Sequence, residues 1–423
     1  MKSDLLLLGA LGACSALDVH VCSLVDDDSA LGAAADGSAA HPFGSVERAR
    51  DLLRAHPRRL AEHHRVLLRG VHALRRPFAL DARDAGTADA TVTYTSWQQT
   101  GTDGGGSGAA GAQQQQQTPA QMTGGVVLPA SAFVPAGSAA PHPGVLVADL
   151  LAHGVNASSL GALGHPYPTK KLELFYGGKP MDLARDPNIG TDALRTWHWA
   201  GYENATGPVG NATGATSVGF ADGARAARWA AATADAAHGA DLWLHGYFKF
   251  DWRDTFVRVA KVDVAGAELV LDSATPPQYE AIKGCRFYAV NALPLLDAAG
   301  EYFVDAQAGK LYFLPPGGSG RVEQQVLVSV LPAVLAVDGA NHTSFEGLTI
   351  TAAQGTVATL SNVASVFVRN STVSNGGGGC LGLHGADSAV EGCSVFGCGS
   401  SGISIVGGSV KTLERGNLSV TGS

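Results

Sequence analysis

A unit of 22–23 residues recurs four times at the end of this chain and constrains its fold more than any other feature. The units begin at Val334, Val357, Cys380 and Ile403. One column of the hand alignment holds only glycine or asparagine, at Gly339, Asn362, Gly385 and Gly408. Both residue types tolerate a positive φ, so this column predicts a tight turn in every unit.

A second part of each unit alternates apolar and hydroxyl side chains. The first column holds Leu348, Ser371, Cys393 and Leu418. The next holds Thr349, Thr372, Ser394 and Ser419, and the third holds Ile350, Val373, Val395 and Val420. This is the period-two pattern of a strand with one buried face. Short strands at a fixed period, with turns in register and no helical segment, predict an all-β parallel β-helix.

The composition agrees with a turn-rich β protein. The 423 residues include 55 glycines, and only 16% of the side chains are charged. A helical protein would not tolerate so much glycine. The net charge of −8 argues against nucleic acid as a partner and suits a neutral substrate better than a polyanion.

The N-terminus predicts a secretory signal peptide over residues 1–16. Lys2 is basic, residues 5–13 are apolar, and small residues continue to Ala16. The apolar run is too short for a stable membrane span, so we expect a secreted, extracellular or cell-wall protein. Residues 11–14 also fit a bacterial lipoprotein box, but the glutamine tract and the glycosylation sequons favour a eukaryotic source.

Four segments follow the signal peptide. Residues 17–97 predict an N-terminal cap and the first strands, with a helix over 45–55 and strands near 18–22, 66–68, 78–80 and 91–94. Residues 98–125 form a low-complexity Gly/Gln insertion that we expect to be disordered. Residues 126–330 predict an irregular β-rich module that contains most of the tryptophans. Residues 331–423 predict regular rungs without a C-terminal cap.

Cysteines and sequons add little chemistry. The five cysteines after the signal peptide are Cys22, Cys285, Cys380, Cys393 and Cys398. An odd number is not a complete disulfide framework, and no spacing suggests zinc, so we predict neither a metal nor a cofactor. Cys393 lies in an apolar column and is expected in the core. Glycan attachment is predicted at Asn156, Asn204 and Asn211, whereas Asn341, Asn370 and Asn417 are expected to be turn residues.

Several segments together resemble a known superfamily. They are residues 18–21, 41–49, 172–175, 178–180, 184–188, 241–247, 251–252, 286–288, 291, 296–297, 300–302, 309–316 and 345–350. In these segments the chain resembles the secreted right-handed parallel β-helix proteins of the pectate-lyase-like superfamily. The subgroup it resembles most includes fucosidase- and xylanase-type glycoside hydrolases. The resemblance implies a helix that caps the β-helix near residue 45, and a carbohydrate substrate.

The resemblance has one departure. In similar proteins the glycine pair that matches Gly407 and Gly408 is commonly followed by Asp-Arg, whereas Ser409 and Val410 follow it here. If that aspartate acts at the active site, this chain lacks it. The strand that ends at Val420 is followed almost at once by Ser423. Since similar proteins continue for several rungs, we expect a truncated β-helix, which leaves two alternatives for the catalytic carboxylates: the candidates within this chain, or residues beyond Ser423.

Candidate catalytic carboxylates come from the repeat register. Glycoside hydrolysis uses two carboxyls about 5–5.5 Å apart for retention or about 6.5–9.5 Å apart for inversion. Strands on adjacent rungs lie about 4.8 Å apart. The register puts Glu346, Arg369 and Glu391 in one column, either as a catalytic pair with Arg369 binding substrate or as an exposed charge ladder.

Other candidates lie elsewhere. His384 and Asp387 suit an acid and a base, or are simply solvated, and Glu414 lies where a loop would project. Trp243, Tyr247 and Trp252, with Asp251 and Asp254, either form a sugar-stacking wall beside the groove or pack the irregular module onto the β-helix.

Two functions remain open. A secreted glycoside hydrolase acting on a cell-wall or matrix polysaccharide is favoured, and a non-catalytic glycan-binding or extracellular-matrix β-helix protein is the alternative. A polysaccharide lyase ranks last, because the repeat columns contain no aspartate cluster and Lys411 is their only lysine.

Overall fold

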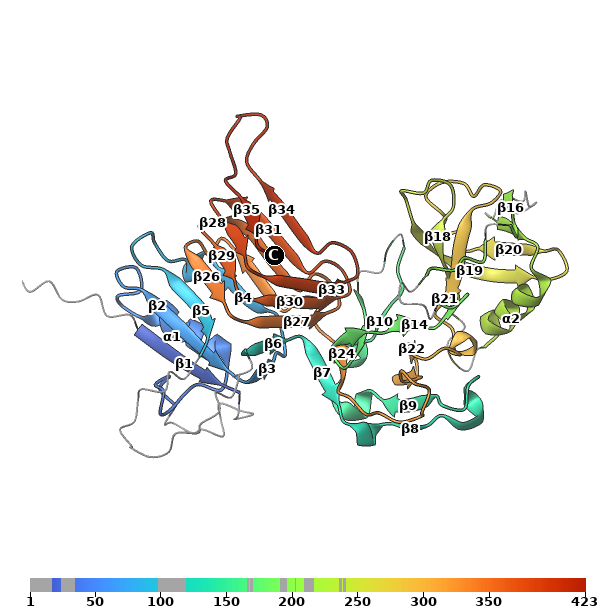
Figure 1. Cartoon of the computed structure of the whole chain (residues 1–423), viewed down its shortest axis with the longest axis horizontal. Helices are drawn as coiled ribbons and strands as arrows, with labels where there is room; N and C mark the ends of the chain where they lie inside the picture. Colours follow the sequence, from blue (N-terminus) through green and yellow to red (C-terminus); the bar gives the residue numbers. More distant parts are fainter. Residues whose placement is uncertain are drawn as a thin grey trace, which may run out of the picture.

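The computed structural model describes residues 17–23, 35–97, 119–165, 167, 170–190, 196–201, 203–208, 217–235, 238 and 241–423. The predicted signal peptide, most of the low-complexity tract and Asn211 lie outside the described residues. Figure 1 shows two lobes, which we call the β-helix and the module. Neither helix of the described chain is long and apolar enough to cross a membrane.

Three parallel sheets form the β-helix. Sheet A contains β1 (Leu17–Cys22), β2 (His64–Arg69), β5 (Val92–Ser96), β26 (Thr343–Glu346), β29 (Phe367–Arg369), β32 (Ala389–Glu391) and β35 (Ser419–Thr421). Sheet B contains β3 (Val71–Ala73), β6 (Gln121–Thr123), β27 (Thr349–Ala353), β30 (Thr372–Gly376) and β33 (Ser394–Cys398). Sheet C contains β4 (Phe78–Asp81), β25 (Leu335–Asp338), β28 (Ala358–Ala364), β31 (Leu381–Ala386) and β34 (Ile403–Gly407). The chain passes from A to B to C, so each rung adds one strand to each sheet.

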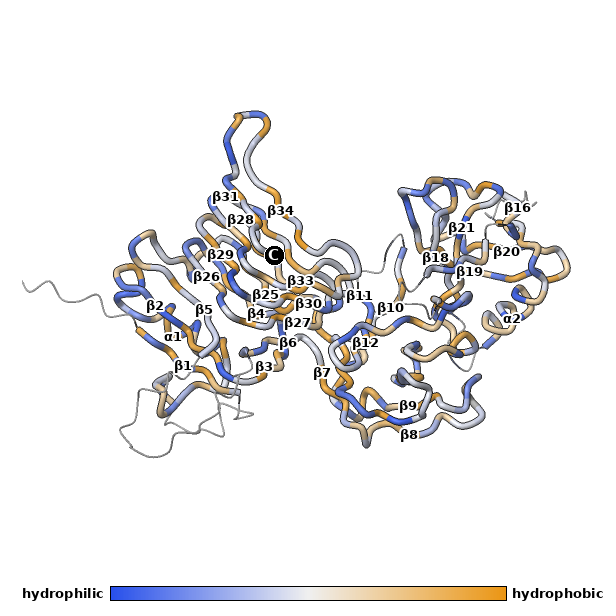
Figure 2. The backbone as a smooth tube through the Cα atoms, in the orientation of Figure 1, coloured by the Kyte–Doolittle hydropathy of each residue, from blue (hydrophilic) through white to orange (hydrophobic). Residues whose placement is uncertain are grey.

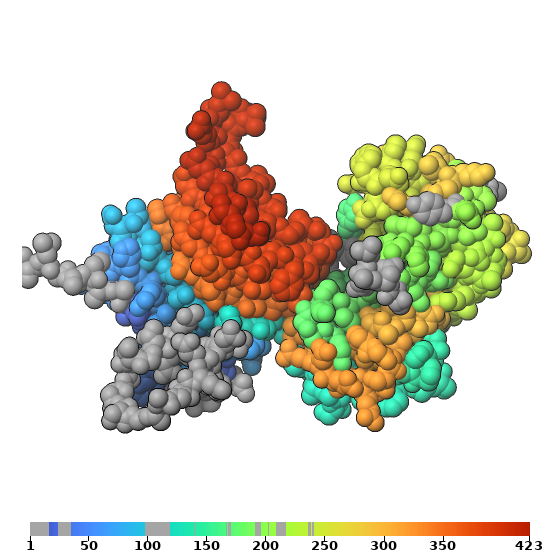
Figure 3. All heavy atoms as spheres, in the orientation of Figure 1, coloured from blue at the N-terminus to red at the C-terminus, as the bar shows by residue number. Residues whose placement is uncertain are grey.

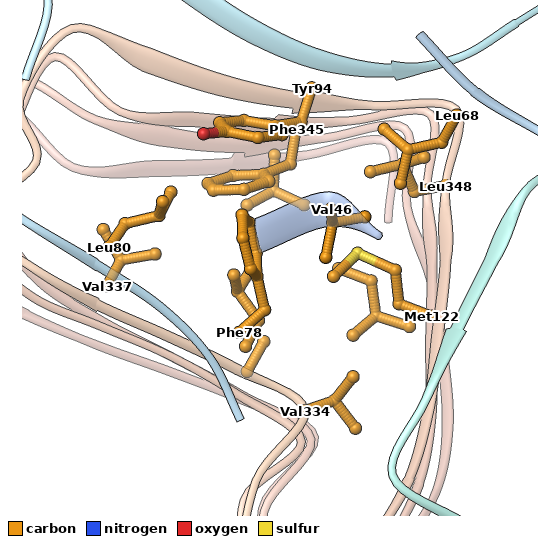
Figure 4. Packing of buried hydrophobic residues seen from close by; sticks show 14 of the residues in the cluster. Val46, Leu68, Phe78, Leu80, Tyr94, Met122, Val334, Val337, Phe345 and Leu348 are labelled. Carbon is orange, nitrogen blue, oxygen red and sulfur yellow. The ribbon is translucent and has the colours of Figure 1, made fainter. Parts of the chain in front are cut away.

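The repeat sets the strand register. Thr349 pairs with Thr372 and Ile350 with Val373, as the predicted columns require. Both apolar residues of the second pair are completely buried. In the last unit the prediction was wrong, because Ser419 and Val420 pair with Ala389 and Val390 of sheet A and not with Ser394 and Val395 of sheet B. Inside the β-helix, equivalent side chains stack from rung to rung, as Tyr94 does on Phe345 with ring centroids 5.5 Å apart (Figure 4). The alternation in the sequence therefore places the apolar face inward.

The helix α1 (Val46–Ala55) lies beside the first strands. The Ser45 side chain accepts a hydrogen bond from the Arg48 backbone N–H, which satisfies one of the free donors at the helix start. Val46, Ala49 and Leu53 join the core of the β-helix. The helix predicted over 45–55 is therefore present.

Two predicted boundaries were wrong. Regular rungs begin with β2, β3 and β4, well before residue 331. The segment expected to be disordered up to residue 125 contains β6, because Met122 is apolar and fully buried between neighbouring strands of sheet B. Composition concealed this strand, which has only three residues.

The positions in the glycine and asparagine column require these residues for two different reasons, whereas the sequence predicted only one. Gly339, Asn362 and Gly408 have φ values of 75°, 54° and 76°, as a tight turn requires. Gly385 lies inside β31 without a positive φ. A Cβ atom there would lie 1.9 Å from the carbonyl oxygen of Val363 on the preceding rung, so close strand approach explains this glycine.

The module, residues 124–334, interrupts one rung between β6 and β25. Its first sheet has the order β13 (Lys179–Pro180), β12 (Leu174–Tyr176), β24 (Val326–Ser329) and β7 (Gly125–Leu128). The second has the order β14 (Asp182–Leu183), β22 (Glu301–Asp305), β23 (Lys310–Phe313), β9 (Leu146–Asp149) and β8 (Val134–Pro135). The third has the order β15 (Arg185–Asp186), β21 (Arg286–Val290), β18 (Trp243–Tyr247), β19 (Thr255–Asp263), β20 (Glu268–Leu271), β17 (Ser217–Phe220) and β16 (Ala205–Pro208).

Smaller elements complete the module. The helix α2 (Gly223–Thr233) packs on β19, and β10 (Gly161–Ala162) pairs with β11 (Lys170–Lys171). The described part of the module also contains the short 3-10 helices η3 (Ala130–Ala132), η4 (Gly137–Ala139), η5 (Leu151–His153), η6 (Ala157–Ser159) and η8 (Leu293–Leu295). A further 3-10 helix, η2 (Ala82–Asp84), follows β4 in the β-helix. Figure 2 shows hydrophobic segments in both lobes. Each lobe has a large apolar cluster of its own, and a small cluster of Phe175, Leu327 and Ala352 joins them.

The module leaves the β-helix at the corner between sheets B and C. In the cross-section of Figure 4, Val334 at this corner lies opposite the side that carries Tyr94 and Phe345 of sheet A. Polar contacts join the lobes. The Asn375 amide donates to the Gly178 carbonyl at 3.1 Å, and the Gln354 amide donates to the carbonyls of Ser329 and Ser159. The module therefore extends away from sheet A.

A disulfide joins Cys380 to Cys398, from the start of β31 to the end of β33. The sequence did not predict this pairing. The other cysteines of the described chain, Cys22, Cys285 and Cys393, are free and buried. The expected core position of Cys393 is confirmed.

Candidate functional site

A groove runs over the outer face of sheet A. Its cavity has a volume of about 410 Å³. The lining includes the hydroxyls of Thr93 and Ser344, the ring of Phe367, and the charged groups of Glu346 and Arg369. A flat ring beside hydroxyl and charged groups offers both an apolar face and hydrogen bonds, which a sugar needs.

The structure brings the predicted column together. Glu346 pairs with Arg369 across β26 and β29, and Arg369 pairs with Glu391 across β29 and β32. The Arg369 Nε donates to Glu391 Oε2 at 2.6 Å, and its Nη1 donates to Glu346 Oε1 at 3.4 Å. The guanidinium also lies 4.1 Å from the Phe367 ring centroid. All three charged side chains are between 34% and 40% exposed, and Arg369 fills the interval between the carboxylates.

The pair of His384 and Asp387 has separate surroundings. Asp387, with a φ of 49°, accepts a hydrogen bond from the Asn417 amide at 2.7 Å. His384 is exposed on β31. The described contacts thus join Asp387 to a turn residue and do not align an acid with a base.

Glu414 lies in the hairpin that projects beyond β34 at the top of Figure 1. Its carboxylate accepts a hydrogen bond from the Thr412 hydroxyl at 3.0 Å. The side chains around it are exposed, including Val410 and Leu413. The loop projects as expected, but its described contacts bring no second carboxyl to Glu414.

The predicted sugar-stacking wall is only partly exposed. Trp243 is 5% exposed and packs with Leu163, Tyr288 and Val290, so its ring cannot stack on a sugar. Trp243 lies on the same face of β18 as His245 and Tyr247, but the side chains with which it packs cover it there. Trp252, by contrast, is 69% exposed, and Tyr247 is half-buried.

Two polar arrangements were missed by sequence reasoning. The first is a relay in which His245 Nε2 lies 2.8 Å from Asp254 Oδ2, and His245 Nδ1 lies 2.6 Å from the Tyr288 hydroxyl. Burial raises the pKa of Tyr288, while the hydrogen bond with His245 lowers the pKa of Asp254. The residues meet because β18 pairs with β21, which lies 43 residues further along the chain, so no local pattern could reveal the relay.

The second is the buried carboxyl of Glu301 on β22. This residue is 3% exposed, and burial raises its pKa to about 8. The backbone N–H groups of Arg185, Asp297 and Ala298 donate to the carboxyl at 3.3 Å each. These three hydrogen bonds partly offset the free-energy cost of burying the Glu301 carboxyl. None of them joins Glu301 to a second carboxyl group.

A smaller cavity of about 240 Å³ lies within the module. Its polar groups bind one another: Arg258 and the Asn291 amide both donate to Asp241. Lys171 donates to Glu173 and to the Tyr302 hydroxyl. Across the described chain, no group of three histidine, cysteine or acidic side chains could hold a metal ion.

The predicted glycan sites differ in exposure. Asn156 is exposed just before the 3-10 helix η6. Asn204 is half-buried, and its amide donates to the Ala200 carbonyl at 3.3 Å. Of these two, Asn156 is the more accessible to a glycosyltransferase.

Comparisons with known proteins identify the class of fold. A family model described as a right-handed beta helix region matches residues 332–420. A solved structure titled "Glycoside hydrolase" is similar, with a TM-score of 0.58 and 15% sequence identity. The alignment covers 89% of this chain and 65% of that one, so this chain spans less than two thirds of the neighbour's length. No curated protein sequence matches. The chain therefore contains a right-handed β-helix region over residues 332–420, and its fold is similar to that of a solved glycoside hydrolase structure.

Proposed function

We propose that this protein is a secreted carbohydrate-active protein that hydrolyses glycosidic bonds in a cell-wall or matrix polysaccharide. The observation that carries the proposal is the column of Glu346, Arg369 and Glu391 on sheet A, in which Glu346 and Arg369 line the groove and Glu391 lies on the next rung. The similarity to a solved glycoside hydrolase fold supports it, although a fold by itself hosts many functions.

The spacing of rungs suits an inverting mechanism. Glu346 and Glu391 are two strands apart in sheet A, which corresponds to a separation of about 9.6 Å along the β-helix. Inverting enzymes use carboxyls about 6.5–9.5 Å apart, since a water must fit beside the sugar. In this proposal one glutamate protonates the leaving oxygen and the other activates the water. Substrate entry displaces Arg369, which then binds a sugar hydroxyl, while the sugar stacks on Phe367.

The contacts of Arg369 favour a second candidate function. Its bonds to both glutamates form a closed ladder of alternating charge, which stabilises the stacked strands without any substrate. A non-catalytic glycan-binding or matrix protein would keep this ladder closed. The alternative therefore predicts binding without turnover.

The test uses the purified chain with aryl glycosides and cell-wall polysaccharides. Wild type should release reducing sugar, and Glu346→Gln or Glu391→Gln should lower kcat/KM by about 100-fold or more, as expected on loss of a general acid or base. Glu62→Gln, which changes a glutamate paired with Arg58 outside the groove, is the matched control and should keep full activity. Full activity in both groove variants would exclude the pair. Binding on a glycan array without hydrolysis would establish the alternative.

A further inference from the structure

We propose that the module carries a separate binding surface for an extended, neutral glycan chain, made of two exposed clusters of aromatic rings. The class of ligand rests on the proposed function; the surface itself rests on the geometry of the module. This surface, which we call the aromatic platform, differs from the wall predicted from the sequence. It excludes Trp243 and includes four rings that the prediction did not name.

The first cluster comprises Trp197, Trp199 and Tyr247. Trp197 is 49% exposed, and its ring is stacked on that of Trp199 with centroids 5.9 Å apart. Trp199 meets Tyr247 edge-on at 5.8 Å. The guanidinium of Arg286 lies 5.2 Å from the Trp199 ring and 4.6 Å from that of Tyr247. The cluster thus combines flat apolar faces with hydrogen-bond donors.

The second cluster comprises Phe250, Trp252 and Tyr279. Phe250 and Trp252 are 37% and 69% exposed, and their rings stack 5.5 Å apart at 17°. Tyr279 meets both rings edge-on, at 4.9 and 6.1 Å. Large exposed aromatic groups that touch one another mark a binding surface more often than single exposed residues do.

One ligand can reach both clusters. Arg286 of the first cluster forms an ion pair with Asp251, between Phe250 and Trp252, at 3.1 Å. Trp252 is only five positions after Tyr247, so their Cα atoms lie at most about 18 Å apart even when the chain between them is fully extended. An oligosaccharide therefore fits the platform better than a single sugar does.

The net charge of the protein favours a neutral glycan. The Arg286 guanidinium is matched by the Asp251 carboxylate, whereas Arg185 and Lys249 lie over the Trp197 and Phe250 rings, 4.5 and 5.5 Å from their centroids. The whole chain nevertheless carries a net charge of −8, which opposes the approach of a polyanion. A pyranose offers an apolar face to each ring and hydroxyls to the charged groups around it. That combination matches the platform better than the apolar core of a protein interface would.

The relay beneath the first cluster holds its rings in place. The Tyr288 ring lies 5.4 Å from that of Trp197 and 5.8 Å from that of Trp199. Its hydroxyl is bonded to His245, which is bonded to Asp254. Rings fixed before binding lose less conformational entropy when a ligand stacks on them. The relay therefore has a positioning role in this proposal and does not touch the glycan.

The platform and the groove on sheet A cannot hold the same sugar residue. The module leaves the β-helix at the corner opposite sheet A and forms the separate lobe seen in Figure 3. The platform thus holds the polymer at a distance from the groove. Its loss should weaken polymer binding and leave the turnover of short substrates unchanged.

The test measures binding of the full chain to insoluble xylan, mannan and cellulose by depletion from solution, and to soluble forms by affinity electrophoresis. The double variant Trp197→Ala/Trp252→Ala should bind at least tenfold more weakly than wild type. Both rings are exposed, so the variant should fold, which an unchanged melting temperature would verify. Phe396→Ala, which removes a 51% exposed ring on β33 of the other lobe, is the matched control and should bind like wild type.

The outcomes separate this proposal from the hydrolase proposal. Equal binding by wild type and the double variant, or an equal loss in Phe396→Ala, would overturn the platform. Preferential binding of wild type to polygalacturonate would overturn its neutral specificity. Platform-dependent binding without hydrolysis would support the platform and remove the hydrolase. Hydrolysis of short aryl glycosides with unchanged polymer binding in the double variant would do the reverse.

Discussion

The β-helix and the module differ in how far apart in the sequence their paired strands lie. In the rungs that follow residue 335, residues 22 or 23 positions apart pair in sheets B and C, as Thr349 pairs with Thr372 and Leu381 with Ile403, so neighbouring rungs repeat the same strand pairing. In the module, β7 pairs with β24, so Gly125 lies beside Ser329 although about 200 residues separate them. This pairing brings the entry and the exit of the module together. A large insertion can therefore interrupt one rung without disturbing its neighbours.

The largest expected effect tests whether the lobes unfold separately. Trp229 of α2 is completely buried, stacked on Phe220 at 5.0 Å, and its Nε1 donates to Asp186 at 2.8 Å. Trp229→Ala should destabilise the module by about 3–5 kcal/mol, because it leaves a cavity and removes a buried hydrogen bond. Phe345→Ala should destabilise the β-helix by a similar amount.

Calorimetry would resolve this contrast. We expect two transitions in wild type, with Trp229→Ala lowering one and Phe345→Ala lowering the other. A single transition that both variants lower equally would show that the small joint of Phe175, Leu327 and Ala352 couples the lobes completely.

The second prediction concerns opposite responses to pH. Burial lowers the pKa of His72 on β3 from 6.5 to about 4, and raises the pKa of Glu301 on β22 from 4.5 to about 8. Between about pH 4 and 6.5 only the unfolded β-helix binds the His72 proton, so the β-helix gains stability as the pH rises. Between about pH 4.5 and 8 only the folded module keeps the Glu301 proton, so the module loses stability over that window. Each effect amounts to a few kcal/mol at most, at roughly 1.4 kcal/mol per pKa unit.

Thermal melts from pH 4.5 to 8.5 would measure these slopes. Glu301→Gln should flatten the response of the module alone, and His72→Met that of the β-helix alone. Parallel slopes for both transitions in wild type would contradict the assignment.

The third prediction uses two glycines of β31. Gly385→Ala should cost about 1–3 kcal/mol, since the new Cβ meets the Val363 carbonyl at 1.9 Å and the strands must separate. Gly382→Ala is the control, because the nearest atom to its Cβ is the His384 Nε2 at 4.0 Å. Chemical denaturation of the two variants should give a loss for the first and little change for the second. Equal stability would mean that the rungs adjust freely.

The same contrast explains what the sequence could predict. Apart from the last unit, whose β35 joins sheet A and not sheet B, the period of the repeats placed the starts of β27, β30 and β33 within one residue, because neighbouring rungs pair there at an offset of 22 or 23 residues. It also placed Glu346, Arg369 and Glu391 side by side. The alternation in the repeats likewise predicted the buried position of Cys393.

Inside the module the same reasoning failed. The burial of Trp243 depends on the antiparallel pairing of β18 with β19 and β21. In neither pairing is the sequence separation between paired residues constant. The pKa of Glu301 depends on burial, which composition does not reveal. In the β-helix itself, the strand β6 was missed because three residues beside a low-complexity tract carry too little periodicity. Long-range pairing, rather than local pattern, decides these features.

The variant with the smallest expected effect on stability, Arg369→Met, tests whether the groove binds substrate or carries only a structural charge ladder. Arg369→Met keeps a side chain that can cover Phe367 but removes both bonds to Glu346 and Glu391. Since these groups are more than one third exposed, the free energy of unfolding should change by less than about 1 kcal/mol. Arg58→Met, which removes the exposed pair with Glu62, should have a comparable effect on stability and none on activity. If Arg369 binds substrate, its variant should raise KM for glycosides at least tenfold. If the column is only a charge ladder, both variants should retain wild-type kinetics and glycan binding, and the groove would then be a structural surface of the β-helix.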